Sequence, residues 1–153
     1  MKDKPQKRHK ALQPLSRQHH HGLLLSWKIR SGFNKDVAPA RIRVYADWFY
    51  ENHLIPHFEV EEKYIFPIIG NDHEKVKSAL ADHRRIKRLF AEKNEDTKTL
   101  SKIEEELEQH IRFEERVLFP EIQKVATEEQ LRYIETIHQP EDFVDKSDDE
   151  FWK

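Results

Sequence analysis

Apolar residues recur every three or four positions in four long stretches of the chain, which is the spacing of amphipathic helices. The stretches cover about residues 11–29, 36–69, 72–93 and 101–125. Their apolar stripes consist of Leu12, Leu15, Leu23, Leu24 and Trp27 in the first, Ile42, Tyr45, Phe49 and Tyr64 in the second, Val76, Leu80, Ile86 and Phe90 in the third, and Ile103, Leu107 and Val117 in the fourth. We therefore expect four long helices.

Glycine, proline and capping residues mark the expected helix ends. Ser31-Gly32 should end the first helix and Gly70-Asn71 the second, while Pro56 should remove one hydrogen bond inside the second helix and kink it. Candidate N-terminal caps are Asn71-x-x-Glu74, Ser101-x-x-Glu104 and Thr127-x-x-Gln130, and the last of these precedes a short fifth helix. Short turns between long helices favour an all-α, antiparallel up-and-down four-helix bundle over residues 11–138.

The C-terminal segment, residues 139–153, is acidic and is expected to be a loose tail, although Phe143, Phe151 and Trp152 could dock on the bundle. Its role and the oligomeric state of the protein stay open. Among the aromatic residues of the helices, those expected in the core are Trp27, Trp48, Phe49 and Phe90.

Composition narrows the class of protein. The chain has 153 residues, enough for one domain, with 37% charged residues and three glycines, a mixture that favours helices with wet outer faces. A net charge of -2 shows no basic excess, so no nucleic-acid partner is expected. No apolar run is long enough to span a membrane, and no apolar segment of a secretory signal follows the basic residues 1–10, so a cytoplasmic location is expected. The absence of cysteine excludes disulfides, thiolate zinc sites and iron–sulfur clusters.

One motif, H-x-x-x-E-E-x-x-x-F-P-x-I, occurs twice, at His57–Ile69 and at His110–Ile122. Residues four positions apart lie on the same face of a helix, so each copy presents an imidazole and a carboxylate in one direction. Nitrogen and oxygen donors without thiolate suit iron, zinc or manganese. A lone inward histidine is more often a satisfied core residue, but several such donors at one height would leave many polar groups unpaired in the core.

These motifs, together with single histidines in the first and third helices, resemble the hemerythrin-like, or HHE cation-binding, family over roughly Leu12 to Val125. The resemblance implies a left-handed four-helix bundle that holds a non-haem di-iron centre, bridged by two carboxylates and capped by histidines. The metal ligands that it implies are His57, Glu61, His83, His110, Glu114 and, from the first helix, His19 or His20. His19 is preferred because Leu15 precedes it by four residues, as in the family.

The sequence departs from the oxygen-carrying hemerythrins at Lys87, where those proteins have a further histidine. The missing donor could be replaced by water or by a side chain such as Glu62 or Glu115, or the position could stay open. Reversible oxygen carriage of that kind is therefore not implied. Of the other histidines, His53 is expected in the core or behind the ligands, and those expected at the surface are His9, His21, His73 and His138.

The function expected from these residues is that of a di-iron protein which binds or senses a small diatomic molecule, oxygen or nitric oxide. An iron storage or donor protein without gas chemistry is the alternative, and a helical interaction module with fortuitous histidines is the third reading. No general base, nucleophile or substrate pocket can be named from the sequence, so no enzyme activity is assigned.

Overall fold

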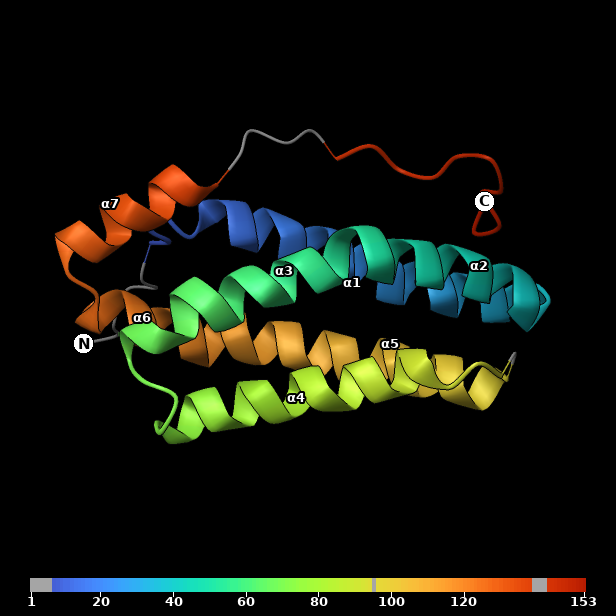
Figure 1. Cartoon of the computed structure of the whole chain (residues 1–153). Coiled ribbons are helices and arrows are strands. Elements are labelled where there is room, and N and C mark those ends of the chain that lie inside the picture. Colours follow the sequence, from blue (N-terminus) through green and yellow to red (C-terminus); the bar gives the residue numbers. More distant parts are fainter. Residues whose placement is uncertain (1–6, 95, 139–142) are drawn as a thin grey trace, which may run out of the picture.

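The protein is built from four helical rods (Figure 1). A computed structural model describes residues 7–94, 96–138 and 143–153, and within these ranges all regular structure is helical. The first rod is α1 (Gln13–Asn34); the second is α2 (Pro39–Phe49), a π turn (Tyr50–Leu54), α3 (Ile55–Val60), a second π turn (Glu61–Ile65) and a 3-10 turn (Phe66–Ile68). The third is α4 (Glu74–Ala91); the fourth is α5 (Thr97–Phe113), a π turn (Glu114–Leu118) and α6 (Phe119–Val125).

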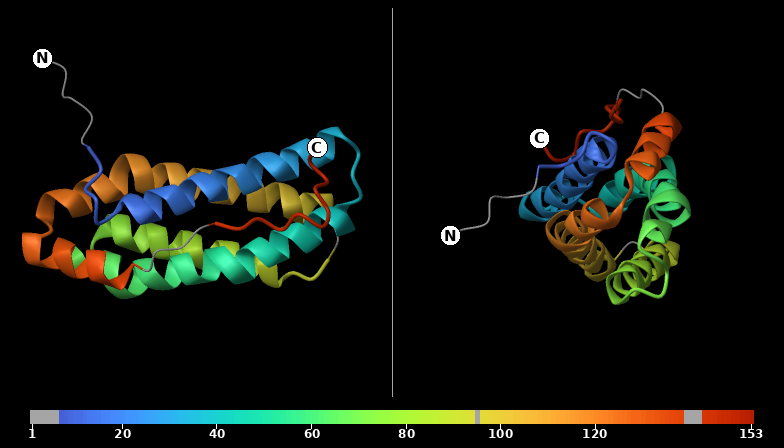
Figure 2. Two further views of the ribbon diagram at one scale, coloured as in Figure 1. Left: turned by 90° about the horizontal axis from the view of Figure 1, so that it is seen from above. Right: turned by 90° about the vertical axis from the view of Figure 1, so that its left-hand side faces the viewer.

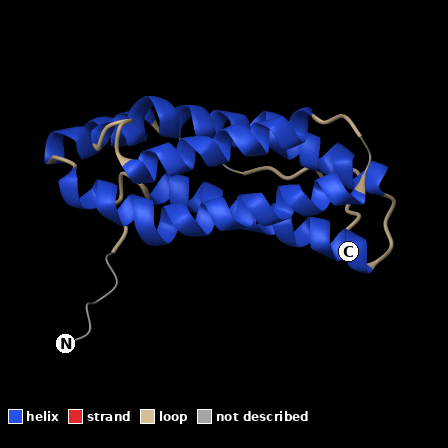
Figure 3. Ribbon diagram, turned by 90° about the horizontal axis from the view of Figure 1, so that it is seen from below, coloured by secondary structure: helices blue, strands red, loops and turns tan. Residues whose placement is uncertain are grey.

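Successive rods run in opposite directions, and the short helix α7 (Glu128–Ile137) follows α6 at one end of the bundle (Figure 1). Figure 3 shows that the described elements are all helices joined by loops and turns. The predicted all-α bundle with a short C-terminal helix is therefore confirmed. The capping box before α7 is also confirmed, because Thr127 and Gln130 exchange side-chain to backbone hydrogen bonds. No helix of the described ranges combines the length and the apolar character needed to cross a bilayer.

Two of the expected N-terminal caps are wrong. The side chain of Asp96 accepts a hydrogen bond from the backbone N–H of Lys98 at 2.7 Å, so the fourth rod begins a turn before Ser101. Aspartate is a strong cap, and an earlier cap prevails when the residues after it also favour a helix. At α4 the cap is the ring of His73 instead of Asn71.

Gly32 was expected to end α1, but it lies buried inside this helix. A Cβ atom at this position would come within 2.7 Å of the Ile42 Cδ1 atom of α2. The glycine is therefore required where α1 and α2 approach closely, and the turn comes later, at Asp36, whose φ is 54°.

Each π turn ends two residues before a proline, namely Pro56, Pro67 or Pro120. Proline has no N–H to donate to the carbonyl four residues earlier, and its ring pushes that carbonyl away. The residue before each proline donates instead to the carbonyl five residues back, which widens the turn. These bonds run from Ile55 to Tyr50, from Phe66 to Glu61 and from Phe119 to Glu114. The kink expected at Pro56 is thus a π turn. The other two π turns begin at the motif glutamates Glu61 and Glu114.

Two apolar clusters fill the two halves of the bundle, and a polar layer separates them. One cluster contains Leu25, Ile86, Leu107 and Ile111, and the other contains Leu15, Ile65, Ala79 and Leu118. The buried histidines of the four rods lie between members of the two clusters along each rod. Burial of the clusters provides the hydrophobic free energy that holds this polar layer in place.

Trp27 is 49% exposed and does not belong to the core, contrary to the sequence interpretation. The interpretation continued the buried face from His19 in steps of four residues, and each such step rotates the side chain by about 40° around the helix. The face that is buried continues through Gly22, Ser26 and Ile29 instead. Trp48 is half-buried, while Phe49 and Phe90 are buried as expected.

The described part of the C-terminal segment, residues 143–153, runs along α1 and α2 and is not loose (Figure 2). Phe151 and Trp152 are buried against the bundle, so the docking alternative holds for them. The buried ammonium of Lys28 lies 2.6 Å from the Asp145 carboxylate and 4.0 Å from the centre of the Trp152 ring. Residues 139–142 lie outside the described ranges.

Asp145 ties the C-terminal segment to the bundle by charge. Burial alone would raise its pKa, but the ion pair with Lys28 and a hydrogen bond donated by the Tyr45 hydroxyl at 2.5 Å lower it below the ordinary value. A carboxyl group whose pKa is depressed on folding stabilises the protein above its unfolded-state pKa and loses that contribution as the pH falls.

We predict that Asp145→Asn lowers the free energy of unfolding by about 1–3 kcal/mol at neutral pH, because the buried Lys28 ammonium loses its counter-charge. Urea unfolding of both proteins measures the difference, which should shrink as the pH falls below about 4, because the Asp145 carboxyl of the unfolded chain takes up a proton there and that of the folded protein does so only at lower pH. Asp148→Asn is the control, because it removes a carboxylate of the same segment whose ion pair with Lys146 is exposed to solvent, and it should change stability much less. A pH-independent difference would contradict this account.

Candidate metal centre

Six donors from four rods meet in the middle of the bundle, and all of them are buried. They are His19 of α1, His57 of α3, Glu61 at the start of the second π turn, His83 of α4, His110 of α5 and Glu114 at the start of the third π turn. Both glutamates are fully buried, and each lies four residues after a histidine on the same helix face. The spacing that was read from the sequence therefore places each pair in the core.

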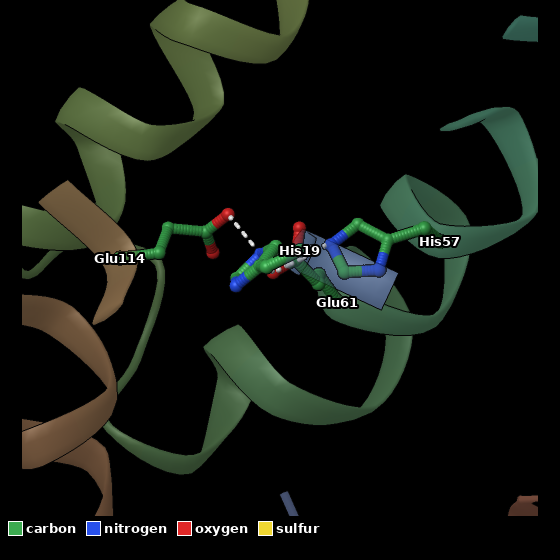
Figure 4. Close-up of side chains that lie close together, drawn as sticks. All are labelled: His19, His57, Glu61 and Glu114. Atoms are coloured by element: carbon green, nitrogen blue, oxygen red, sulfur yellow. Dashed lines mark hydrogen bonds and ion pairs between the residues drawn. The ribbon is translucent and has the colours of Figure 1, made fainter. Parts of the chain in front are cut away.

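The donors form two groups that share both glutamates. One group is His19, His57, Glu61 and Glu114, shown in Figure 4, and the other is Glu61, His83, His110 and Glu114. Within each group one donor atom per residue lies within 4.8 Å of all the others. The Glu61 carboxylate reaches both groups, since Oε2 is 3.3 Å from His57 Nε2 and Oε1 is 3.1 Å from His83 Nε2. Two adjacent metal positions bridged by two carboxylates fit this arrangement.

Each of the four imidazoles bonds through Nδ1 to an acceptor on a neighbouring rod. The pairs are His57 with Gln18 at 2.6 Å, His83 with Glu62 at 2.7 Å, His110 with Asp82 at 3.0 Å and His19 with Glu115 at 2.7 Å. An acceptor at Nδ1 holds a proton on that nitrogen and leaves the lone pair on Nε2, which is the form that a metal binds. All four Nε2 atoms are thus turned toward the shared glutamates.

The buried polar atoms of this layer are not satisfied by one another. None of the four carboxylate oxygens of Glu61 and Glu114 receives a well-directed hydrogen bond, and the Nε2 atoms of His19 and His57 lie only 3.1 Å apart. The Nε2 atoms of His83 and His110 are 3.2 Å apart. Facing lone pairs and unpaired buried carboxylates cost free energy unless positive charge lies between them. The residues present therefore fit a pair of cations.

The charges of the layer agree with this requirement. Burial alone would lower the pKa of His110, but Glu114 and the hydrogen bond with Asp82 outweigh it and raise that pKa to about 10. Burial also opposes the change at His19, whose pKa Glu114 and Glu115 raise well above the ordinary value. The carboxylates thus hold positive charge here, and a metal ion would have to displace the protons that the imidazoles bind.

The structure brings together six of the seven side chains that the sequence singled out as metal ligands. His20 is not among them: it is exposed, belongs to neither group, and has its ring 5.7 Å from that of His21. Successive residues of a helix point about 100° apart, so only one of the two neighbouring histidines can share the face of Leu15 and Gly22. Geometry places His19 there.

The residues that orient the imidazoles were missed or given another role by the sequence interpretation. Glu62 and Glu115 were considered for an open coordination position, but they bond to Nδ1 atoms, and Lys87 lies 3.6 Å from Glu62. Gln18 and Asp82 were not singled out at all. The sequence did contain a signal, because each precedes a site histidine of the first or third rod by one residue.

The remaining histidines lie outside both groups. His53 packs against the rings of Trp48 and Phe49. This packing corresponds to the core position, one of the two places that were expected for it. His21 is half-buried, with its ring stacked on that of Phe143 at 3.9 Å, so it does not simply face solvent. The half-buried rings of His9, His73 and His138 each contact backbone groups near helix ends.

A cavity of about 590 Å³ lies beside the centre. His19, His57 and His110 line it, whereas His83 does not. The cavity thus borders both imidazoles of one group and only one imidazole of the other, so the group of His19 and His57 is the more accessible to a small molecule.

Comparison with protein families gives a match between residues 9–122 and the model described as the hemerythrin HHE cation binding domain. The match covers more than half of the chain and includes all six donors. Neither the curated proteins nor the solved structures contain a match to this chain.

The two candidates of the first helix can be separated by substitution. We predict that His19→Ala lowers the affinity for a divalent metal by at least about a hundredfold, because it removes a buried donor of one group. His20→Ala, one residue away on the exposed face, should leave the affinity unchanged. Competition with a chromophoric chelator measures both, and the reverse order of effects would show that α1 is rotated relative to the structure.

The hydrogen bond at Nδ1 of His83 can be weakened without removing a donor. We expect Glu62→Gln to lower metal affinity by about tenfold to a hundredfold, because an amide oxygen makes the imidazole less basic than a carboxylate does. The matched control is Glu59→Gln, at an exposed residue of α3. Equal affinities of the two variants, both folded by circular dichroism, would remove the proposed orienting role of Glu62.

Proposed function

The chain belongs to the hemerythrin HHE cation-binding domain family, and on this premise we propose that it holds a di-iron centre which binds or senses a small diatomic molecule, oxygen or nitric oxide. His19 and His57 would hold one iron, His83 and His110 the other, and both glutamates would bridge them. The observation that carries the proposal is that both donor groups share Glu61 and Glu114, whose oxygens lack hydrogen-bond donors.

Iron is preferred on the chemistry of the donors. Each position offers two imidazole nitrogens and two carboxylate oxygens, without thiolate, and non-haem iron uses such sets with positions left free for an added ligand. Zinc and manganese accept the same donors and remain the alternatives that metal analysis must separate. Bound iron supplies free coordination positions and one-electron redox chemistry.

The chain itself orients the donors and excludes water. The Phe58 ring stacks on that of His83 with centroids 3.9 Å apart, and Phe119 stacks on His19 at 5.2 Å. Both phenylalanines are buried, so they form apolar walls beside the imidazoles. The cavity lined by His19 and His57 provides an approach for a small ligand.

This arrangement favours gas binding over iron storage or donation. A donor protein must release its metal readily, whereas here every proposed ligand is at most 5% exposed and each imidazole is held at its second nitrogen. A purely structural role would not explain why four buried carboxylate oxygens receive no well-directed hydrogen bond.

We predict about two irons per chain in protein purified from iron-replete cells, because the two donor groups accept one ion each. Absorption spectra of the reduced protein should change on exposure to oxygen or to nitric oxide. The iron should raise the melting temperature, since a ligand that binds only the folded state stabilises it. His57→Ala should abolish the spectral change, with His20→Ala as the matched control.

Three results would count against the proposal. If the purified protein contained zinc or manganese instead of iron, the proposed cofactor would be wrong, although the metal site would stand. If a mild chelator removed the iron, and neither gas changed the absorption spectrum, the storage alternative would be supported. A melting temperature that is the same with and without metal would remove the metal centre altogether.

A further inference from the structure

The cavity beside the donors is much larger than a diatomic ligand needs. Its volume is about 590 Å³, whereas a molecule the size of water occupies roughly 30 Å³ in the liquid. Sites for small organic molecules have volumes of about 300–1,000 Å³. The size of this cavity therefore points to an organic ligand.

The walls of the cavity combine apolar side chains with hydrogen-bond donors. The apolar side chains include Phe49, Leu54, Phe58, Leu107, Ile111 and Phe143, and the polar ones outside the metal centre are Arg17, Gln18, His21, Asn52, His53 and His138. His21 Nδ1 is buried and has no hydrogen-bond partner. Such walls suit a molecule with an apolar body and at least one polar group.

Among the described residues that line the cavity, the charged side chain is that of an arginine and none is a carboxylate. Aspartate and glutamate make up 29 of the 153 residues, yet neither occurs among the described residues that line the cavity, whereas Arg17 does. The Arg17 side chain is exposed at the wall and forms no ion pair among the described residues. A guanidinium without a carboxylate partner favours an anion, and it pairs with a carboxylate through two parallel hydrogen bonds.

The C-terminal segment completes the wall. Phe143 stacks on His21 with ring centroids 3.9 Å apart and lies 4.7 Å from the ring of His53. Two residues later, Asp145 anchors the segment to Lys28. Figure 2 shows this segment running between α1 and the second rod. Phe143 lines the cavity together with residues of both rods.

We propose that this cavity binds a small organic acid, with its carboxylate paired to Arg17 and its apolar body against Phe143 and the apolar side chains of the second rod. Because His19 and His57 line the same cavity, the bound acid would lie beside the metal position that a diatomic ligand can approach. This role goes beyond the proposed gas binding, and the pairing with Arg17 does not require a metal ion.

Three probes share one phenylbutyl group and differ in the charge of their polar group: 4-phenylbutyrate, its amide and 4-phenylbutylamine. Their affinities therefore report the effect of charge apart from that of shape. Isothermal titration calorimetry with the full chain, both metal-free and iron-loaded, should show the acid binding about tenfold more tightly than the amide, because a charge-assisted pair replaces a neutral hydrogen bond. The amine should not bind. Both preparations should give this order.

Arg17→Gln should lower the affinity for the acid by about tenfold and leave that for the amide unchanged. Phe143→Ala should weaken acid and amide equally, because it removes a wall that both touch. The control is Arg84→Gln, at an exposed arginine of α4 outside the cavity, and it should change neither affinity.

An amide that binds as tightly as the acid, or the absence of binding by all three probes, would overturn the proposal. Acid binding that needs iron and ignores both Arg17→Gln and Phe143→Ala would identify the acid as a metal ligand and would also overturn it. Acid binding with the expected order in a protein that takes up no iron would instead support the cavity site while the gas-binding proposal fails.

Discussion

Four hydrogen bonds to histidine Nδ1 atoms fix the heights of the four rods relative to one another. Each joins two neighbouring rods, and together they form a closed circuit. The pairs are Gln18 of α1 with His57, Glu62 with His83 of α4, Asp82 of α4 with His110 of α5, and Glu115 with His19 of α1. A slip of one rod would break two of these bonds and leave buried polar groups unpaired, at about 1–3 kcal/mol each. The circuit that sets the register of the bundle also turns every Nε2 atom inward.

A polar layer across the middle of a core is costly, and the rest of the structure compensates for it. Apolar clusters on both sides supply the hydrophobic free energy of folding, and aromatic rings such as Phe58 and Phe119 cover the imidazoles. Protons or metal ions must supply the positive charge, because Glu61 and Glu114 have no other donors. The site is therefore a part of the fold, since neither its donors nor its charge balance can be changed without affecting packing.

The sequence predicted what depends on local spacing and missed what depends on contacts between rods. The pairs His57–Glu61 and His110–Glu114 followed from helical geometry alone, and so did the four rods. The preference for His19 over His20 rested on Leu15, four residues earlier, and agrees with the burial of His19. The exposure of Trp27 and the need for Gly32 depend on how α1 is rotated and how closely α2 approaches it, which no local pattern contains. The docking of the C-terminal segment depends in the same way on a pair, Lys28 and Asp145, that is far apart along the chain.

The two halves of the centre repeat one pattern but are not equivalent. The imidazoles of α4 and α5 are both held by carboxylates, whereas His57 is held by the amide of Gln18, which occupies the position that Asp82 has in the other half. A neutral acceptor makes an imidazole a weaker donor than a carboxylate does. In the proposed di-iron centre, the iron near His57 would thus receive less electron density from its ligands. Both imidazoles of that position line the cavity, against one imidazole of the other, so the more electrophilic position and the more accessible position coincide. The amide of Gln18 in place of a carboxylate therefore distinguishes the accessible half of the centre from the other half.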